Sequence, residues 1–170
     1  MLIYFTMRTI IHDLNENEFS ELFDNLNDYI INSKECNHNC IGCFSCWIKH
    51  PKKCMINDNY SNVVDCISKS TELIIISRCR YGCYDSDVKK VLERCIGYVL
   101  PYFTIRNDEI HHESRYNKSL KFTAYLYGDV SRDDKKCMDI LVRANAINLN
   151  ANQYEVKYFE KTKELVKCIH

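Results

Sequence analysis

A short apolar run at residues 73–76 limits the fold more than any other segment of this chain. It reads LIII, is mostly β-branched, and has Glu72 before it and Arg78 shortly after it. A strand with one face in water would alternate apolar and polar side chains, so a continuous run predicts a strand buried on both faces. Such strands belong to parallel sheets that are covered by helices on both sides.

Strands and helices alternate along the rest of the chain. Further strands are predicted at 7–12, 29–32, 122–127 and 154–159. Helices are predicted around 17–23, from about 59, and at 86–100 and 131–149, where apolar residues recur at spacings of three and four. This alternation predicts an α/β domain with a parallel sheet between two helical layers.

The segments between these elements contain fewer apolar residues. We expect 78–85 to be a loop, and the helix 86–100 to end at Pro101. Residues 102–121 look polar and irregular, with a hairpin turn at Asn107 and Asp108. Arg94, within the predicted helix, is interpreted as a solvated charge.

Length and charge narrow the function classes. At 170 residues, one domain spanning 1–170 is expected. Basic and acidic residues balance at 23 each, which predicts neither a nucleic acid nor a membrane as partner. No apolar run is long enough to span a bilayer, and the first residues lack a basic leader and a cleavage site. We therefore expect a cytoplasmic protein.

Eleven cysteines are many for a chain of this size. A disulfide scaffold is disfavoured because the chain is not small, shows no export signal and has an odd number of cysteines. Cytosolic cysteines at ligand-like spacing more often hold metal or take part in chemistry. Cys66, Cys95 and Cys137 lie near helical apolar faces and are predicted core residues. Cys36 and His38 are assigned to a solvated loop.

The most specific motif is Cys40-Ile-Gly-Cys43-Phe-Ser-Cys46, with Cys54 eight positions later. Thiolates are soft donors that suit zinc or iron–sulfur clusters. Three cysteines in so tight a run favour a cluster over a zinc knuckle, whose two pairs lie further apart. Four thiols without metal, with Trp47 packed against the loop, are the alternative.

Residues 40–55 resemble the cysteine loop of the NAD(P)H-dependent FMN reductase and multimeric flavodoxin superfamily, in its iron–sulfur flavoprotein branch. The resemblance continues through Asp58, the strand 73–76, the loop 77–84 and the helix 86–100. It implies a flavodoxin-like doubly wound three-layer sandwich with a five-stranded parallel sheet in the order 2-1-3-4-5. FMN would then lie at the carboxyl ends of the strands, as in open α/β sheets generally.

The same resemblance implies the site residues. The loop bordering the flavin ring would contribute Arg78, Cys79, Arg80, Tyr81, Gly82 and Cys83, and a second loop Tyr127, Gly128 and Asp129. An aromatic side chain there can stack on the ring, and glycine lets a backbone N–H approach it. A [4Fe-4S] cluster would be held by Cys40, Cys43, Cys46 and Cys54, and NAD(P)H would be the electron donor. A homodimer or homotetramer is also implied, with residues 98–116 as the contact surface.

The first turn departs from the family pattern. Relatives have a Gly/Ser/Thr-rich turn that binds the FMN phosphate at a helix N-terminus, whereas residues 12–18 read HDLNENE. A carboxylate ~5 Å from a phosphate costs about 3 kcal/mol per charge pair at an effective dielectric of about 20. A helix N-terminus returns only about 0.3–1 kcal/mol. We therefore predict an altered phosphate site, and hypothesise that Arg78 and Arg80 supply the missing positive charge.

Two functions follow from these patterns. The first is an FMN-dependent oxidoreductase or electron carrier, which uses reduced nicotinamide or electrons from a cluster. The second is a flavodoxin-like scaffold without flavin, acting as a metal-binding or interaction protein. Cys79 and Cys83 are interpreted as ordinary loop thiols, with a redox pair as the alternative; nearby arginines would lower a thiol pKa there.

Overall fold

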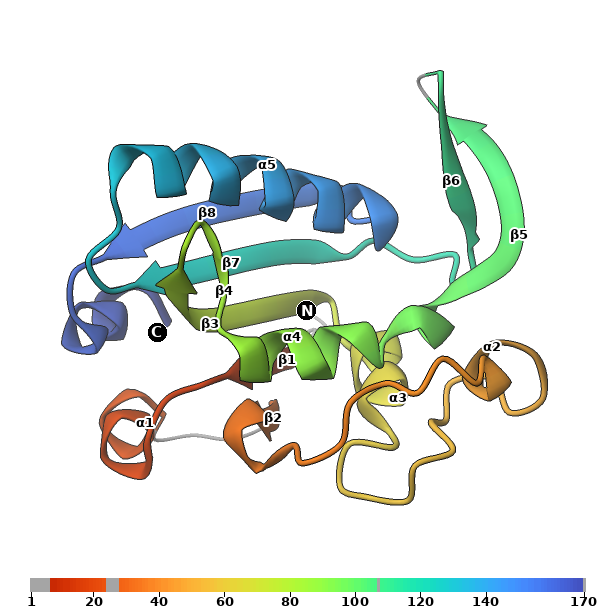
Figure 1. Ribbon diagram of the computed structural model, residues 1–170, viewed down its shortest axis with the longest axis horizontal. Helices are drawn as coiled ribbons and strands as arrows, with labels where there is room; N and C mark the ends of the chain where they lie inside the picture. The colour runs from red at the N-terminus through yellow and green to blue at the C-terminus, as the bar shows by residue number, and fades with distance from the viewer. Residues whose placement is uncertain (1–6, 24–27, 107, 170) are drawn as a thin grey trace, which may run out of the picture.

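Five parallel strands form the centre of the computed structural model, which describes residues 7–23, 28–106 and 108–169 (Figure 1). Their bounds are β1 (Arg8–His12), β2 (Tyr29–Asn32), β3 (Glu72–Arg80), β7 (Lys121–Tyr127) and β8 (Gln153–Phe159). The strand order is β2-β1-β3-β7-β8 and every neighbouring pair among them is parallel. This order confirms the predicted flavodoxin-like sheet, with β7 and β8 as the fourth and fifth strands.

The apolar run in β3 is buried on both faces, as its sequence predicts. Leu73 and Ile75 belong to the core on one side of the sheet, and Ile74 and Ile76 to the core on the other. Successive side chains of a strand point to opposite faces, so one run of four residues supplies both layers. All four are at most 2% exposed.

Helices cover both faces of the sheet. The core on one face is completed by α3 (Val63–Lys69), α4 (Ser86–Glu93) and α5 (Arg132–Asn148). The core on the other face is completed by α1 (Glu16–Leu22) and α6 (Val166–Ile169). Short helical turns connect these elements: η1 (Ser33–Glu35), α2 (Ser45–Ile48), η2 (Ile96–Tyr98) and η3 (Thr162–Leu165). Among the described helices, none has the length and apolarity that a membrane span needs. The expectation about a leader falls on residues 1–6, outside the described part.

The helix predicted over 86–100 is wrong in its second half. α4 ends at Glu93, η2 follows, and β5 (Val99–Arg106) then contains the apolar residues that we assigned to the helix, with Pro101 inside the strand. Gly97, in η2, lies against α2: a Cβ added there would stand 2.8 Å from the backbone oxygen of Cys46. The chain therefore turns into β5 at the point where α2 packs on it.

The segment predicted as irregular forms a β-hairpin. β5 pairs antiparallel with β6 (Glu109–Ser114), and the hairpin projects from the body of the molecule (Figure 1). Of the predicted turn, Asn107 lies outside the described residues, and Asp108 has a φ of 62°, which suits a tight turn. The missed signal was the alternation of apolar and polar residues at 103–106, which read FTIR, just before the turn.

The predicted loop 78–85 is a second hairpin. β3 continues to Arg80 and pairs antiparallel with β4 (Cys83–Tyr84). Tyr81 and Gly82, at the turn, both have positive φ, of 51° and 68°. Two such residues are typical of the type I′ turn, whose twist matches the twist of a hairpin. The tip lies on α5, since a Cβ added at Gly82 would stand 2.7 Å from the Cβ of Cys137.

Gly82→Ala should lower the free energy of unfolding by about 2–3 kcal/mol. The substitution holds an alanine in a left-handed backbone conformation and creates a clash with α5. Gly42→Ala is the matched control: its φ is +65° and nothing lies within 4 Å of an added Cβ. That variant should lose about 1 kcal/mol from backbone strain alone. Urea unfolding of both variants measures the difference. Equal losses would mean that the hairpin tip does not rest on α5.

Candidate functional site

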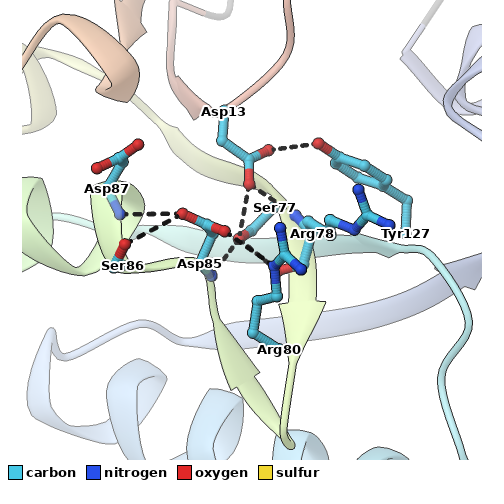
Figure 2. Close-up of polar contacts among 8 residues, drawn as sticks. All are labelled: Asp13, Ser77, Arg78, Arg80, Asp85, Ser86, Asp87 and Tyr127. Carbon is cyan, nitrogen blue, oxygen red and sulfur yellow. Dashed lines mark hydrogen bonds and ion pairs between the residues drawn. The ribbon is translucent and has the colours of Figure 1, made fainter.

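The carboxyl ends of β1, β3 and β7 meet at one edge of the sheet. The chain leaves β1 toward β2 on one side, while β3 lies on the other, so the strand order reverses here. Ligands of open α/β sheets bind at such a point. We call the polar group at this edge, Asp13, Ser77, Arg78, Asp85 and Tyr127, the carboxyl-edge cluster (Figure 2).

Asp13 is the centre of the carboxyl-edge cluster. Its Oδ2 accepts the backbone N–H of Arg78 at 2.8 Å and the hydroxyl of Ser77 at 3.4 Å. Its Oδ1 accepts the hydroxyl of Tyr127 at 3.0 Å. The residue is only 2% exposed. β1, β3 and β7 are thus joined by one buried carboxyl group (Figure 2).

Burial makes this carboxyl group unusual. It raises the pKa of Asp13 to about 6, although the hydrogen bonds from Arg78 and Tyr127 act in the opposite direction. Burial and the neighbouring carboxylate also raise the pKa of Tyr127 above its usual range. The Tyr127 hydroxyl therefore stays protonated as the donor to Asp13 at neutral pH.

A second carboxylate lies behind the first. Asp85 accepts the Nε–H of Arg80 at 3.2 Å and the backbone N–H of Asp87 at 3.2 Å, which caps α4. The backbone N–H of Asp85 donates to the Ser77 hydroxyl at 2.9 Å. Ser77 thereby links the carboxylate of Asp13 to the backbone of Asp85, as Figure 2 shows.

Four backbone N–H groups of the first turn form hydrogen bonds within the chain. Asp13 donates to the oxygen of Ile76 at 3.2 Å, and Leu14 to His12 Nδ1 at 3.3 Å. Asn15 and Glu18 form a capping box, in which each side chain accepts the other's backbone N–H. These groups do not face a ligand, and the helix that they open, α1, has seven residues. The first turn therefore does not fit a phosphate.

Three of the predicted flavin-lining residues lie together. Arg78 pairs with Tyr127 across β3 and β7, and a Cβ added at Gly128 would stand 3.7 Å from Cγ of Arg78. The side chain of Arg78 is exposed. Asp129 is exposed in the same loop, where it lines a cavity of about 780 Å³ with Gly128.

The other predicted flavin-lining residues lie further out on the β3–β4 hairpin. Tyr81 is 99% exposed, and Gly82 faces Cys137 of α5. Arg80 is held by Asp85. Cys79 and Cys83 are half-buried, and burial raises the pKa of Cys79, the reverse of the lowering expected from the arginines. That all these residues line a flavin stays a prediction.

The four cysteines of the motif line one cavity of about 580 Å³. Cys40 and Cys43 are exposed, Cys54 is half-buried and Cys46 is buried. Burial, and secondarily the other three thiols, raise the pKa of Cys46. Their donor atoms suit a soft metal. Across the described ranges, however, no three His, Cys, Asp or Glu side chains are close enough to hold an ion, so the predicted metal site is not formed in this arrangement.

An aromatic strip borders this cavity. The rings of Phe44 and Trp47 are stacked with centroids 5.4 Å apart, and His112 follows at 4.8 Å and Phe103 at a further 4.7 Å. The indole N–H of Trp47 donates to the Val99 oxygen at 2.8 Å. The strip therefore joins the cysteine loop to the β5–β6 hairpin. Trp47 packs against Phe44 of the cysteine loop, as in the alternative in which the four thiols hold no metal.

Arg94 is not the solvated charge that we predicted. Its side chain is 0% exposed and donates to both carboxylate oxygens of Asp58, each at 2.7 Å. It also donates to Sγ of Cys36 at 3.6 Å, and Cys36 is buried instead of solvated. The hydrogen bonds from Arg94 are the main reason that the pKa of Asp58 lies below its usual value. The signal was available, since Arg94 lies three residues after Val91, on the apolar side of α4.

The three cysteines predicted to lie in the core differ in their burial. Cys95 is buried, Cys66 is half-buried, and Cys137 is exposed on α5, so the core assignment of Cys137 is wrong. Sequence reasoning did not identify the hydrogen-bond partners of two candidate residues, Asp13 and Asp58. Their partners are 65 and 36 residues away in the chain, and no local pattern shows such pairs.

Neither the known family models nor the curated proteins contain a match to this chain. Solved structures do. An FMN-dependent NADH-azoreductase from Bacillus anthracis, solved with FMN, aligns at a TM-score of 0.56 and 11% identity, over 95% of this chain and 92% of that one. An NAD(P)H:quinone oxidoreductase from Methanothermobacter marburgensis aligns at 0.56 and 9%, over 95% and 90%. An NADH:FMN oxidoreductase in its apo form aligns at 0.52 and 11%, over 91% and 75%. At such identities the likeness shows the flavodoxin-like fold.

Proposed function

We propose that this chain is a flavin-dependent oxidoreductase or electron carrier that takes electrons from reduced nicotinamide. The observation that carries the proposal is the exposed guanidinium of Arg78 beside Tyr127 and Gly128, at the switch point of a doubly wound sheet. The solved structures of similar fold support it, because the names of two of them include FMN and NADH. When bound, a flavin supplies the hydride and electron chemistry, and the protein positions it.

The chain's own groups would hold such a ligand by charge and by close approach. Arg78 takes part in no ion pair among the described side chains, so its positive charge is available to an electron-rich ring or to a phosphate. Gly128, with a φ of 114°, lets the backbone approach a planar group closely. Arg80 is less available because Asp85 binds it.

Arg78→Ala should weaken flavin binding about tenfold or more, because a charge-assisted hydrogen bond contributes about 1.5–3 kcal/mol. Arg80→Ala should have a smaller effect, and Arg143→Ala, an exposed charge on α5, should have none. Quenching of flavin fluorescence measures the affinities, and flavin-dependent oxidation of NADH or NADPH measures turnover. A colourless protein that binds neither FMN nor riboflavin would rule the proposal out.

The second candidate is a metal-binding or interaction protein without flavin. It is favoured by the four thiols around one cavity and by the buried carboxylate at the carboxyl edge. In this candidate Cys40, Cys43, Cys46 and Cys54 bind zinc or, as in the resemblance, a [4Fe-4S] cluster. The absorbance spectrum of protein purified without oxygen distinguishes flavin from iron–sulfur bands, and elemental analysis detects zinc.

Three further properties belong to the proposal. We place residues 1–170 in one domain, and we place the protein in the cytoplasm, supported by eleven cysteines that are all free. We also propose a homodimer or homotetramer. The exposed Phe103, Ile105 and Ile110 on the β5–β6 hairpin support that assembly, because monomers rarely expose large apolar patches.

A further inference from the structure

The turn after β1 holds a buried carboxylate where a phosphate-binding turn would present backbone N–H groups. We infer that Asp13 makes this site select flavins without a phosphate, so that riboflavin binds at least as tightly as FMN. This inference rests on the proposed function, since it names the ligand class of the same site.

The first argument is the supply of donors. A turn that binds phosphate needs several free N–H groups directed at one point. Here the N–H groups of Asp13, Leu14 and Asn15 are all bonded within the chain, as is that of Glu18. A phosphate would have to break these bonds, or bind through the N–H groups of Glu16 and Asn17 beside the carboxylates of Glu16 and Glu18.

The second argument is the position of the carboxylate. Both oxygens of Asp13 are used, and their donors come from Arg78 and Tyr127, on the two strands that follow β1 in the sheet. The carboxylate therefore occupies the place of an anion at this edge (Figure 2). A second anion beside it would find its donors taken.

The third argument is the charge around the turn. Asp85 lies in the same cluster, and Glu16 and Glu18 stand in the first turn of α1. Two cations oppose them: Lys34, which acts on Asp13, and Arg78, whose exposed side chain lies beside Tyr127 on the other side of the edge. A phosphate, with a charge between −1 and −2, would be repelled by most of these groups. A flavin with an uncharged tail would not be.

The experiment compares FMN and riboflavin on the full-length wild type and on Asp13→Asn and Asp13→Ser. Quenching of flavin fluorescence gives both dissociation constants. Asp13→Asn keeps the shape of the side chain and removes its charge, and Asp13→Ser also opens space. Asp108→Asn, at the tip of the far hairpin, is the control for net charge. Circular dichroism confirms that each variant is folded.

We expect the wild type to bind riboflavin as tightly as FMN or more tightly. At least one folded Asp13 variant should bind FMN about tenfold tighter than the wild type, with riboflavin changed less than threefold. If the wild type binds neither flavin but a variant binds FMN, the role of Asp13 holds while the proposed function fails. Wild-type FMN binding tenfold tighter than riboflavin binding overturns the inference, and so do variants whose FMN affinity equals that of the wild type.

Discussion

Arg94→Met should lower the free energy of unfolding by about 3–5 kcal/mol, the largest loss that we expect from a single substitution in this chain. Arg94 is fully buried and bonds both oxygens of Asp58. Removing the guanidinium leaves the Asp58 carboxylate, 18% exposed, with only the backbone N–H of Tyr60 and the ring of His38 as partners. Breaking such a pair on one side costs more than the pair itself contributes. Urea unfolding followed by far-ultraviolet circular dichroism measures the loss.

A double-mutant cycle separates the pair from the rest of the packing. Asp58→Asn alone should lose a similar amount, because it leaves the buried arginine without its counter-charge. Arg94→Met combined with Asp58→Leu should recover part of the loss, since no unpaired charge remains. Arg143→Met, at an exposed position, should change stability by less than about 0.5 kcal/mol. Strictly additive losses in the double variant would contradict a coupled pair.

The second large effect concerns pH, and it begins with His12. This side chain is 2% exposed, and burial lowers its pKa from 6.5 to about 4. Between these pH values His12 is protonated in the unfolded chain and neutral in the folded chain. The contribution of the neutral His12 side chain to the free energy of unfolding is therefore fully present above pH 6.5. It falls by about 3 kcal/mol as the pH drops to 4.

Asp13 acts in the opposite direction over nearly the same range. Burial raises its pKa from 3.8 to about 6, so the folded chain holds a proton there that the unfolded chain has lost. Its contribution to the free energy of unfolding rises by about 2 kcal/mol as the pH drops from 6 to 4. Because the two residues are neighbours with opposite shifts, their effects nearly cancel in the wild type.

Single substitutions should reveal how each residue alone makes the free energy of unfolding depend on pH. His12→Asn keeps an acceptor for the N–H of Leu14 and removes the titration, so this variant should gain stability relative to wild type as the pH falls from 6 to 4. Asp13→Asn should lose stability relative to wild type over the same range. Urea unfolding at half-unit pH intervals measures both. Two variants with parallel pH profiles would show that the shifts are absent.

The sheet could be predicted from the sequence because its signals are local. The run 73–76 is buried on both faces, and the alternation of strands and helices predicted the parallel sheet. The order of its strands was implied by the family resemblance. The helix 132–148 was also predicted almost to the residue, since Met138, Val142 and Ala146 repeat at helical spacing on its buried side. Where periodicity and burial agree, the chain leaves few alternatives.

The candidate site was harder to predict because contacts distant in the sequence decide it. Gly97 lies against Cys46 where the helical pattern stops, and nothing in the neighbouring residues shows that contact. Likewise, the acidic residues of the first turn led us to predict an altered phosphate site, but the bonds of Asp13 to Arg78 and Tyr127 depend on strand pairing. The residue types showed that the first turn is acidic, but only the fold shows which side chains Asp13 contacts.

Trp47 is the only tryptophan of the chain. Its indole lies between Phe44 and His112 and bonds the start of β5, so its emission reports whether the cysteine loop is docked. Circular dichroism, in contrast, is dominated by the helices and the sheet. The protein thus carries two independent optical probes, one for each region. Their melting curves, recorded on the same sample, reveal whether loop and sheet unfold as one cooperative unit or in sequence.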